Sequence, residues 1–224
     1  MRVAPPRSEA ELLERASGLA GLPIAELASR AGLSLPQSSR RGKGFAGTLL
    51  ERLLGASATS LPEPDFQLIG VELKTLPIDS HGKPQESTYV CSVPLHDNHG
   101  VTWETSVVHH KLRRVLWLPL VVSPGDNPGD RVVGAPLLWS PDADEEATLR
   151  SDFEELMDLV VLGQLELITA QHGRWLQIRP KGASSRSRTA SYDTDGKPSR
   201  VLPRGFYLRT QFTTRIIQKH YLTP

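Results

Sequence analysis

The sequence predicts a mixed α/β fold, because helical and strand patterns alternate along its 224 residues. Apolar side chains recur at helical spacing over residues 8–19, 23–30, 42–55, 140–162 and 210–220. Short apolar runs bounded by turn residues predict strands over residues 66–78, 87–94, 114–122, 175–179 and 206–209. A chain of this length can bury one sizeable core, or two small lobes sharing one.

The ends of the predicted helices carry capping signals. Ser8 and Glu11 have the spacing of a capping box, and Gly55 is placed to end the helix of residues 42–55. The acids that open the helix of residues 140–162 complement the positive end of its dipole. They need no functional explanation, although a protein-contact surface is an open alternative.

Turn residues predict how the strands connect. The Gly/Pro-containing turn at residues 79–84 predicts a hairpin between the strands on either side. Pro119 predicts that the strand of residues 114–122 lies at a sheet edge or contains a bulge, since proline donates no ladder hydrogen bond. Residues 123–130 are the expected boundary between lobes. The Ser/Arg/Gly-rich residues 182–200 are expected to form a loop that is mobile without a ligand.

The charge distribution is uneven, although the net charge is only +1. Residues 171–224 contain eleven Lys/Arg and two acids, so the preceding residues are net acidic. A basic segment predicts a polyanionic partner such as nucleic acid, because each neutralised phosphate releases counterions. A solvated basic surface is the alternative.

Composition excludes several classes of protein. The lone cysteine, Cys91, excludes an internal disulfide and a multi-cysteine zinc site, and its apolar neighbours predict a buried strand residue. No apolar run approaches the roughly 20 residues of a membrane span, and the N-terminus has no signal-peptide core. We therefore expect a cytoplasmic protein.

One group of residues predicts hydrolytic chemistry. Glu72 and Lys74 are two residues apart, so their side chains leave a strand from the same face. Pro62 and Pro64 exclude a regular helix upstream and let Asp65 enter from a turn. Phosphodiester hydrolysis needs oxygen ligands for a hard cation, a cation near the phosphate and a positioned water. The group predicts a nuclease centre, and the alternative is a half-buried strand with a solvated Glu/Lys pair.

Four further positions have weaker patterns. Glu51 is either a third carboxylate near a metal ion or a solvent-facing helical residue, and Lys111 faces either the scissile phosphate or water. Arg179 ends a predicted strand and can bind O6 and N7 of a guanine, or else a phosphate or solvent. Tyr207 contacts a base edge or methyl group, or packs in the core.

Several strings, in order along nearly the whole chain, resemble the MutH family of mismatch-repair endonucleases. They include Lys43-Gly44-Phe45, Gly70-Val71-Glu72-Leu73-Lys74-Thr75, His110-Lys111-Leu112, Leu176-Gln177-Ile178-Arg179-Pro180-Lys181 and Pro203-Arg204-Gly205-Phe206-Tyr207. The resemblance implies a restriction-endonuclease-like fold, with a mixed sheet flanked by helices and two arms around a DNA cleft. The expected arms are a catalytic arm over about residues 1–122 and a basic DNA-recognition arm over about residues 123–224.

The resemblance also implies roles for individual residues. Asp65, Glu72 and Lys74 match the family's catalytic triad, with Glu51 and Lys111 as further active-site residues. Asp65, Glu72 and the Leu73 backbone carbonyl would hold one or two Mg²⁺ ions, for which Mn²⁺ would substitute. The DNA-contacting positions are Lys43, Tyr89, Arg179, Pro180, Lys181 and Tyr207. Tyr89 stands where the family can carry phenylalanine, and Tyr207 at the position associated with adenine methylation.

The implied activity is nicking of the unmethylated strand of hemimethylated GATC, 5′ to G, by a monomer at the bacterial nucleoid. MutL would activate the enzyme after MutS has found a mismatch. Two alternatives remain open at this point: a GATC-specific restriction endonuclease, whose relatives share the catalytic strings, and a DNA- or MutL-binding module that does not cut.

Overall fold

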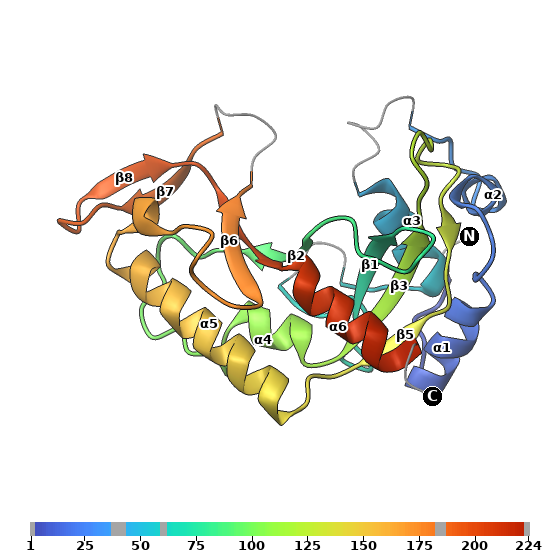
Figure 1. Cartoon of the computed structure of the whole chain (residues 1–224), viewed down its shortest axis with the longest axis horizontal. Coiled ribbons are helices and arrows are strands. Elements are labelled where there is room, and N and C mark those ends of the chain that lie inside the picture. The colour runs from blue at the N-terminus through green and yellow to red at the C-terminus, as the bar shows by residue number, and fades with distance from the viewer. Residues whose placement is uncertain (1–2, 37–43, 59–61, 182–186, 222–224) are drawn as a thin grey trace. The chain divides into compact units, whose positions relative to one another are not determined.

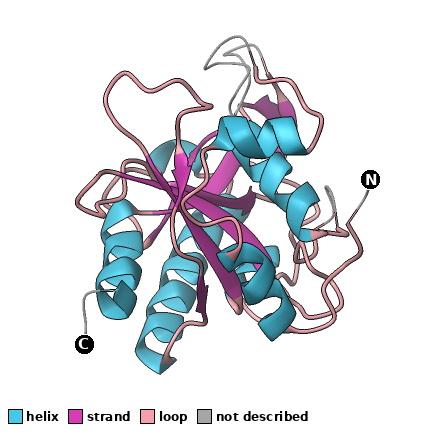
Figure 2. Ribbon diagram, turned by 90° about the vertical axis from the view of Figure 1, so that its right-hand side faces the viewer, coloured by secondary structure: helices cyan, strands magenta, loops and turns pink. Residues whose placement is uncertain are grey.

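The computed structural model describes residues 3–36, 44–58, 62–181 and 187–221. It confirms the expected α/β class, with helices and strands alternating along the chain (Figures 1 and 2). The chain divides into two compact units, each discontinuous in sequence. Unit 1 comprises Met1–Glu86, Arg113–Ser140 and Ile216–Pro224, and unit 2 comprises Ser87–Leu112 and Pro141–Arg215.

This division differs from the expected boundary at residues 123–130. Those residues lie inside unit 1, while 87–112 belong to unit 2. The physical reason is strand pairing. In unit 1, β1 (Glu72–Ile78) pairs in parallel with β3 (Val115–Val121), which ties the chain after residue 112 to the strand before residue 87.

The unit 1 sheet is mixed. On the other side of β3 from β1, β4 (Val132–Val133) and β5 (Leu137–Trp139) both pair with it antiparallel. β3 is therefore a central strand, and the expectation that Pro119 marks a sheet edge is wrong. β5 pairs with residues 115–117 and β4 with residues 120–121, so Pro119 falls between these partners. Its missing N–H therefore costs no hydrogen bond there, while its carbonyl accepts the Gly134 amide at 2.8 Å.

Unit 1 also contains three whole helices, α1 (Glu9–Ser17), α2 (Ile24–Arg30) and α3 (Phe45–Leu54), and the end of the final helix from Ile216 onward. The Ser8 side chain accepts the Glu11 amide, and Gly55 ends α3 with a positive φ, as predicted. The predicted capping box is only half formed, because the Glu11 carboxylate accepts the Arg7 amide and not the Ser8 amide. The helices and the sheet share one core, to which each contributes fully buried side chains, among them Leu12, Leu27, Leu50, Val71, Leu116 and Leu118.

The unit 2 sheet is antiparallel, in the order β2 (Thr88–Ser92), β9 (Arg204–Leu208) and β6 (Leu176–Pro180). The long helix α5 (Ala143–Val161) lies against β6 (Figure 1), and its Phe153 ring packs 5.6 Å from that of Phe206 on β9. The Asp152 carboxylate of α5 is buried and accepts the amides of three successive residues, Arg174, Trp175 and Leu176, at 2.6–2.8 Å. This carboxylate fixes the start of β6.

Shorter elements complete unit 2: α4 (Val107–Leu112), the 3₁₀ turn η1 (Leu165–Leu167), and the strands β7 (Thr189–Tyr192) and β8 (Pro198–Val201). The final helix is α6 (Thr210–Tyr221). No helix of the described residues combines the length and the apolar character needed to cross a membrane.

Two predicted connections are wrong. The turn at residues 79–84 exists, with Gly82 donating to the Asp79 carbonyl at 3.0 Å, but the flanking strands do not pair with each other. β1 pairs with β3, of which residues 115–120 are all buried, and β2 pairs with β9. A turn constrains only its own neighbourhood and does not decide these long-range partners. The expected loop over residues 182–200 contains the hairpin of β7 and β8, paired from Thr189↔Val201 to Tyr192↔Pro198. Residues 182–186 lie outside the described residues.

Candidate active site and nucleic-acid interface

A tight loop brings Asp65 to the start of β1. Phe66 and Val71 pair with each other through two backbone hydrogen bonds of 2.9 and 3.3 Å, and Gly70 turns the chain with a φ of +64°. The strand predicted from residue 66 therefore begins only at Glu72. Asp65 and Glu72 flank this antiparallel pair on the same side. They therefore face each other across the two chain segments and become neighbours.

Asp65 is anchored at both its backbone and its side chain. Its carbonyl accepts the amides of Ser57 and Ala58 at 2.8 and 3.2 Å. Its carboxylate oxygen Oδ2 accepts the Leu73 amide at 2.8 Å, and the residue is only 7% exposed. The carboxylate therefore lies at the edge of β1, beside the residue between Glu72 and Lys74.

Glu72 and Lys74 form a buried ion pair. Their exposed fractions are 2% and 9%, and Lys74 Nζ donates to Glu72 Oε1 at 2.6 Å. The two side chains share a face of β1 as expected, but the alternative of a solvated pair is wrong. A buried charge is costly unless it is paired and hydrogen-bonded, so this pair has a defined geometry that an exposed pair would lack.

The donor set of this site fits a magnesium ion. Mg²⁺ binds one or two carboxylates and keeps several water molecules, and Asp65 and Glu72 supply two carboxylates. In an extended strand the N–H and C=O of one residue point to the same side, so the Leu73 carbonyl shares the strand edge of its amide, beside Asp65. Within the described ranges, no group of three or more His, Cys, Asp or Glu side chains is arranged to hold a metal ion.

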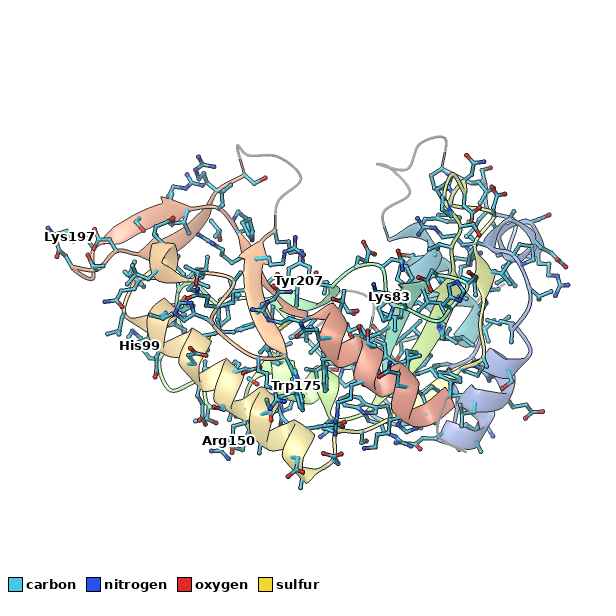
Figure 3. The ribbon with its side chains drawn as sticks, viewed as in Figure 1. Lys83, His99, Arg150, Trp175, Lys197 and Tyr207 are labelled. Atoms are coloured by element: carbon cyan, nitrogen blue, oxygen red, sulfur yellow. The ribbon has the colours of Figure 1, made fainter. Side chains whose placement is uncertain are left out.

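The sheet of unit 2 presents a second group of predicted residues. Tyr89 on β2 is the cross-strand partner of Tyr207 on β9, and their rings meet edge-on with centroids 5.4 Å apart. Tyr207 is labelled in Figure 3. The Lys181 ammonium lies 3.7 Å from the Tyr89 ring centroid, and the Arg179 guanidinium 5.7 Å from that of Tyr207. Tyr207 is half-buried and belongs to this face, not to the core. Arg179 and Pro180 are exposed.

Known proteins resemble this chain over nearly its full length. The family model of the DNA mismatch repair enzyme MutH matches residues 54–152. The chain is 54% identical over 219 residues to the DNA mismatch repair protein MutH of Klebsiella pneumoniae, covering 98% of this chain and 95% of that protein. It is 55% identical over 217 residues to the MutH of Pectobacterium atrosepticum, covering 97% and 94%. The identity to that of Vibrio parahaemolyticus is 52% over 217 residues, covering 97% and 96%.

The chain belongs to the MutH family. Membership confirms the restriction-endonuclease-like fold, in which a mixed sheet is flanked by helices. The matched segment of the MutH model contains the Asp65 loop, the Glu72–Lys74 pair and α4.

The remaining residues predicted from the MutH resemblance are distributed between the units. Glu51 is half-buried on α3, in the same unit as Asp65 and Glu72. Lys111 is half-buried on α4 and belongs to unit 2. Lys43 lies outside the described residues. The catalytic roles of Glu51 and Lys111 and the DNA contact of Lys43 therefore stay predictions.

The sequence reasoning missed three residues of the unit 2 face: Ser87, Ser92 and Gly205. Ser87 precedes Tyr89 by two residues, so the two-residue period of a strand predicts that both side chains share a face. The expectation that Tyr89 contacts DNA could have been extended to Ser87 on this ground. Ser92 had no such signal, because it follows Tyr89 by three residues. A register shift between Tyr89 and Cys91 inserts one residue into β2 and returns Ser92 to the Tyr89 face.

Proposed function

We propose that this chain is a Mg²⁺-dependent DNA endonuclease of mismatch repair, which nicks the unmethylated strand of hemimethylated GATC 5′ to G. The observation that carries the proposal is the buried set of Asp65, Glu72 and Lys74 in a chain of the MutH family. A buried ammonium hydrogen-bonded to a carboxylate beside a second carboxylate is the donor set that magnesium-assisted phosphodiester hydrolysis requires.

The proposed mechanism assigns a task to each group. Asp65, Glu72 and the Leu73 carbonyl would hold one or two Mg²⁺ ions, or Mn²⁺ in their place. A bound Mg²⁺ lowers the pKa of a water ligand and offsets charge on the phosphate. The Lys74 ammonium, fixed by Glu72, orients the attacking water and stabilises the negative charge that develops on the phosphoryl oxygens. Attack in line with the P–O3′ bond breaks that bond, leaving a 3′-hydroxyl and a 5′-phosphate on G.

Strand and sequence choice are assigned to unit 2. Arg179 binds a guanine edge, since an arginine fork fits O6 and N7 in the major groove. Tyr207 senses the methyl group of the adenine, and Tyr89, Pro180 and Lys181 contribute further DNA contacts. Lys43, which belongs to unit 1, contributes another. A single active site in a monomer cuts one strand. MutL activates the enzyme after MutS has found a mismatch, in the bacterial cytoplasm at the nucleoid.

Digestion of three duplexes tests the proposal. Unmethylated, hemimethylated and fully methylated GATC duplexes are incubated with Mg²⁺, with and without MutL. We expect nicks only in unmethylated strands, faster with MutL, and none in the fully methylated duplex. Double-strand cleavage that is insensitive to MutL would favour a restriction endonuclease, and binding without cleavage would favour a non-cutting module.

A matched pair of variants ties the activity to the site. Asp65→Asn removes a carboxylate charge from the proposed metal site and should abolish nicking with either Mg²⁺ or Mn²⁺. Asp144→Asn makes the same change at an exposed position on the first turn of α5 and should nick as the wild type does. Full nicking by Asp65→Asn would remove the basis of the assignment.

A further inference from the structure

Arg179 on β6 and Lys181, which directly follows β6, reach across the neighbouring strand to hydroxyl groups in β2 and just before it. The Arg179 Nη1 donates to Ser87 Oγ at 2.6 Å. The Lys181 ammonium donates to the Tyr89 hydroxyl and lies 3.5 Å from Ser92 Oγ. The Tyr89 and Ser92 hydroxyls are themselves hydrogen-bonded at 3.1 Å. Both cations are therefore held by neutral oxygen atoms of residues 87–92 in the protein without DNA.

A glycine makes this reach possible. β9 separates β2 from β6, so the outer strands are about 10 Å apart. Gly205 on β9 pairs with Arg179 on one side and with Ser92 on the other, at the crossing point. A Cβ atom at Gly205 would lie 2.9 Å from Cε2 of Tyr89 and 3.1 Å from Cε2 of Tyr207. The absent side chain leaves the space that the two rings occupy.

Tyr89 contacts Lys181 in two ways. Its hydroxyl accepts a hydrogen bond from the ammonium, and its ring lies beneath the ammonium at 3.7 Å. A ring face attracts a cation, and the edge contact with Tyr207 fixes the ring itself. A free lysine side chain loses rotamer freedom when it binds a ligand, so a lysine that is already held loses less in the binding step.

We propose that Tyr89 is a positioning residue, which acts with Ser92 to hold the Lys181 ammonium for the DNA, while Ser87 holds Arg179 in the same manner. The inference rests on the proposed function, because it takes duplex DNA as the ligand of this face. It assigns the Tyr89 hydroxyl an effect on DNA that passes through Lys181.

A double-mutant cycle in the full chain tests this path. Tyr89→Phe removes the hydroxyl and keeps the ring, and the dissociation constant for a hemimethylated GATC duplex is measured in EDTA. We expect affinity to fall about three- to tenfold, the range for one lost hydrogen bond. In a Lys181→Met background, Tyr89→Phe should change the dissociation constant less than twofold. An equal loss in both backgrounds would show that the hydroxyl does not act through Lys181, and would overturn the proposal.

Two controls distinguish the effect of this hydroxyl from a general loss of affinity or of folding. Tyr192→Phe removes the hydroxyl of a 40% exposed tyrosine on β7 and should leave the dissociation constant unchanged. The thermal midpoint of each variant is measured, so that a loss of affinity is compared only between folded proteins. Because the cycle is read as binding without metal, it remains decisive if the wild type binds duplex but fails to nick, an outcome that contradicts the proposed function alone.

Discussion

In unit 1 the candidate site holds its charges below the surface, whereas in unit 2 the cations proposed to contact DNA lie at the surface. Asp65, Glu72 and Lys74 are each less than one-tenth exposed and are held by one another and by backbone amides. Arg179 is exposed and Lys181 half-buried, and both are held by neutral hydroxyls and aromatic rings.

The difference matches two different tasks. Charges in a low-dielectric surrounding interact strongly and keep a fixed geometry, as catalysis of a single bond cleavage requires. Cations held by neutral groups at the surface can bind phosphates or base edges without breaking an ion pair. If this contrast holds, substitutions of buried and of surface charges should have distinct effects on stability, cleavage and recognition.

The largest effect is expected for Asp152, a buried charge to which we assign a role in stability only. Asp152→Ala removes a buried carboxylate that accepts three amides, and we expect a loss of about 3–5 kcal/mol in the free energy of unfolding, measured in urea. Asp152→Asn keeps one acceptor oxygen and should lose less. A loss below about 1 kcal/mol for Asp152→Ala would show that the β6 start is fixed by other contacts.

Lys74→Ala should act on the chemical step. We expect kcat for nicking to fall about 10²–10³-fold, the range for removing one group that stabilises developing charge, with duplex affinity in EDTA changed little. Since the variant leaves Glu72 buried without its partner, it should also be less stable than the double variant Glu72→Gln/Lys74→Met. Weakened binding with normal kcat would place Lys74 in recognition and remove the contrast between the units.

Arg179→Ala should act on recognition. The free-energy difference between binding GATC and binding a duplex with the G replaced should shrink by about 1–3 kcal/mol. Arg179→Lys should recover affinity for non-specific duplex but not the discrimination, because an ammonium lacks the forked geometry. If specific and non-specific binding fell equally, Arg179 would contact phosphate and not a base.

Gly205→Ala should disturb the same face through the rings. The added Cβ cannot fit against Tyr89 and Tyr207 unless one of the rings moves. We therefore expect duplex affinity to fall about tenfold, which corresponds to roughly the free energy of one hydrogen bond. Gly18→Ala is the control, since Gly18 has a helical φ of −67° and only ordinary contacts at its Cβ. An unchanged affinity of Gly205→Ala would mean that the ring arrangement is not needed for binding.

The smallest effect concerns an ion pair on the surface of unit 1. The hydrogen bond from Arg114 lowers the pKa of Glu9 below its usual 4.5. The pair therefore contributes stability above about pH 4.5, which is lost as the pH falls through the lower folded-state pKa. Because the Glu9 side chain is 40% exposed, solvent screening limits the contribution to less than about 1 kcal/mol. Glu9→Gln should be slightly less stable than the wild type in urea unfolding at pH 7, and the difference should shrink as the pH falls below about 4.5.

Much of the local structure was predictable from short stretches of sequence. The Ser8 cap, the Asp142–Glu145 capping box of α5 and the Gly55 end of α3 all depend on contacts within four residues. The shared face of Glu72 and Lys74 followed from the period of a strand. Their burial did not, because alternation alone does not show that a charged face is covered.

The main errors of prediction from the sequence concern which strands pair with each other. The turn at residues 79–84 suggested a hairpin, yet β1 and β2 belong to different sheets. Pro119 suggested an edge, yet it lies in the central strand at the gap between β4 and β5. Both errors arise because a turn or a proline constrains only its own neighbourhood, while strand pairing depends on the apolar surface that distant segments bury together.

The sequence alone was enough to predict the family, the helix caps and the set of Asp65, Glu72 and Lys74. Each of these features depends on residues that are contiguous or closely spaced in the chain. The folded chain was needed to show that Lys181 meets a tyrosine 92 residues earlier, and that a bulge and a glycine make room for the contact. Such contacts form only after the long-range ladders have closed, and no local spacing in the chain encodes which strands will close them.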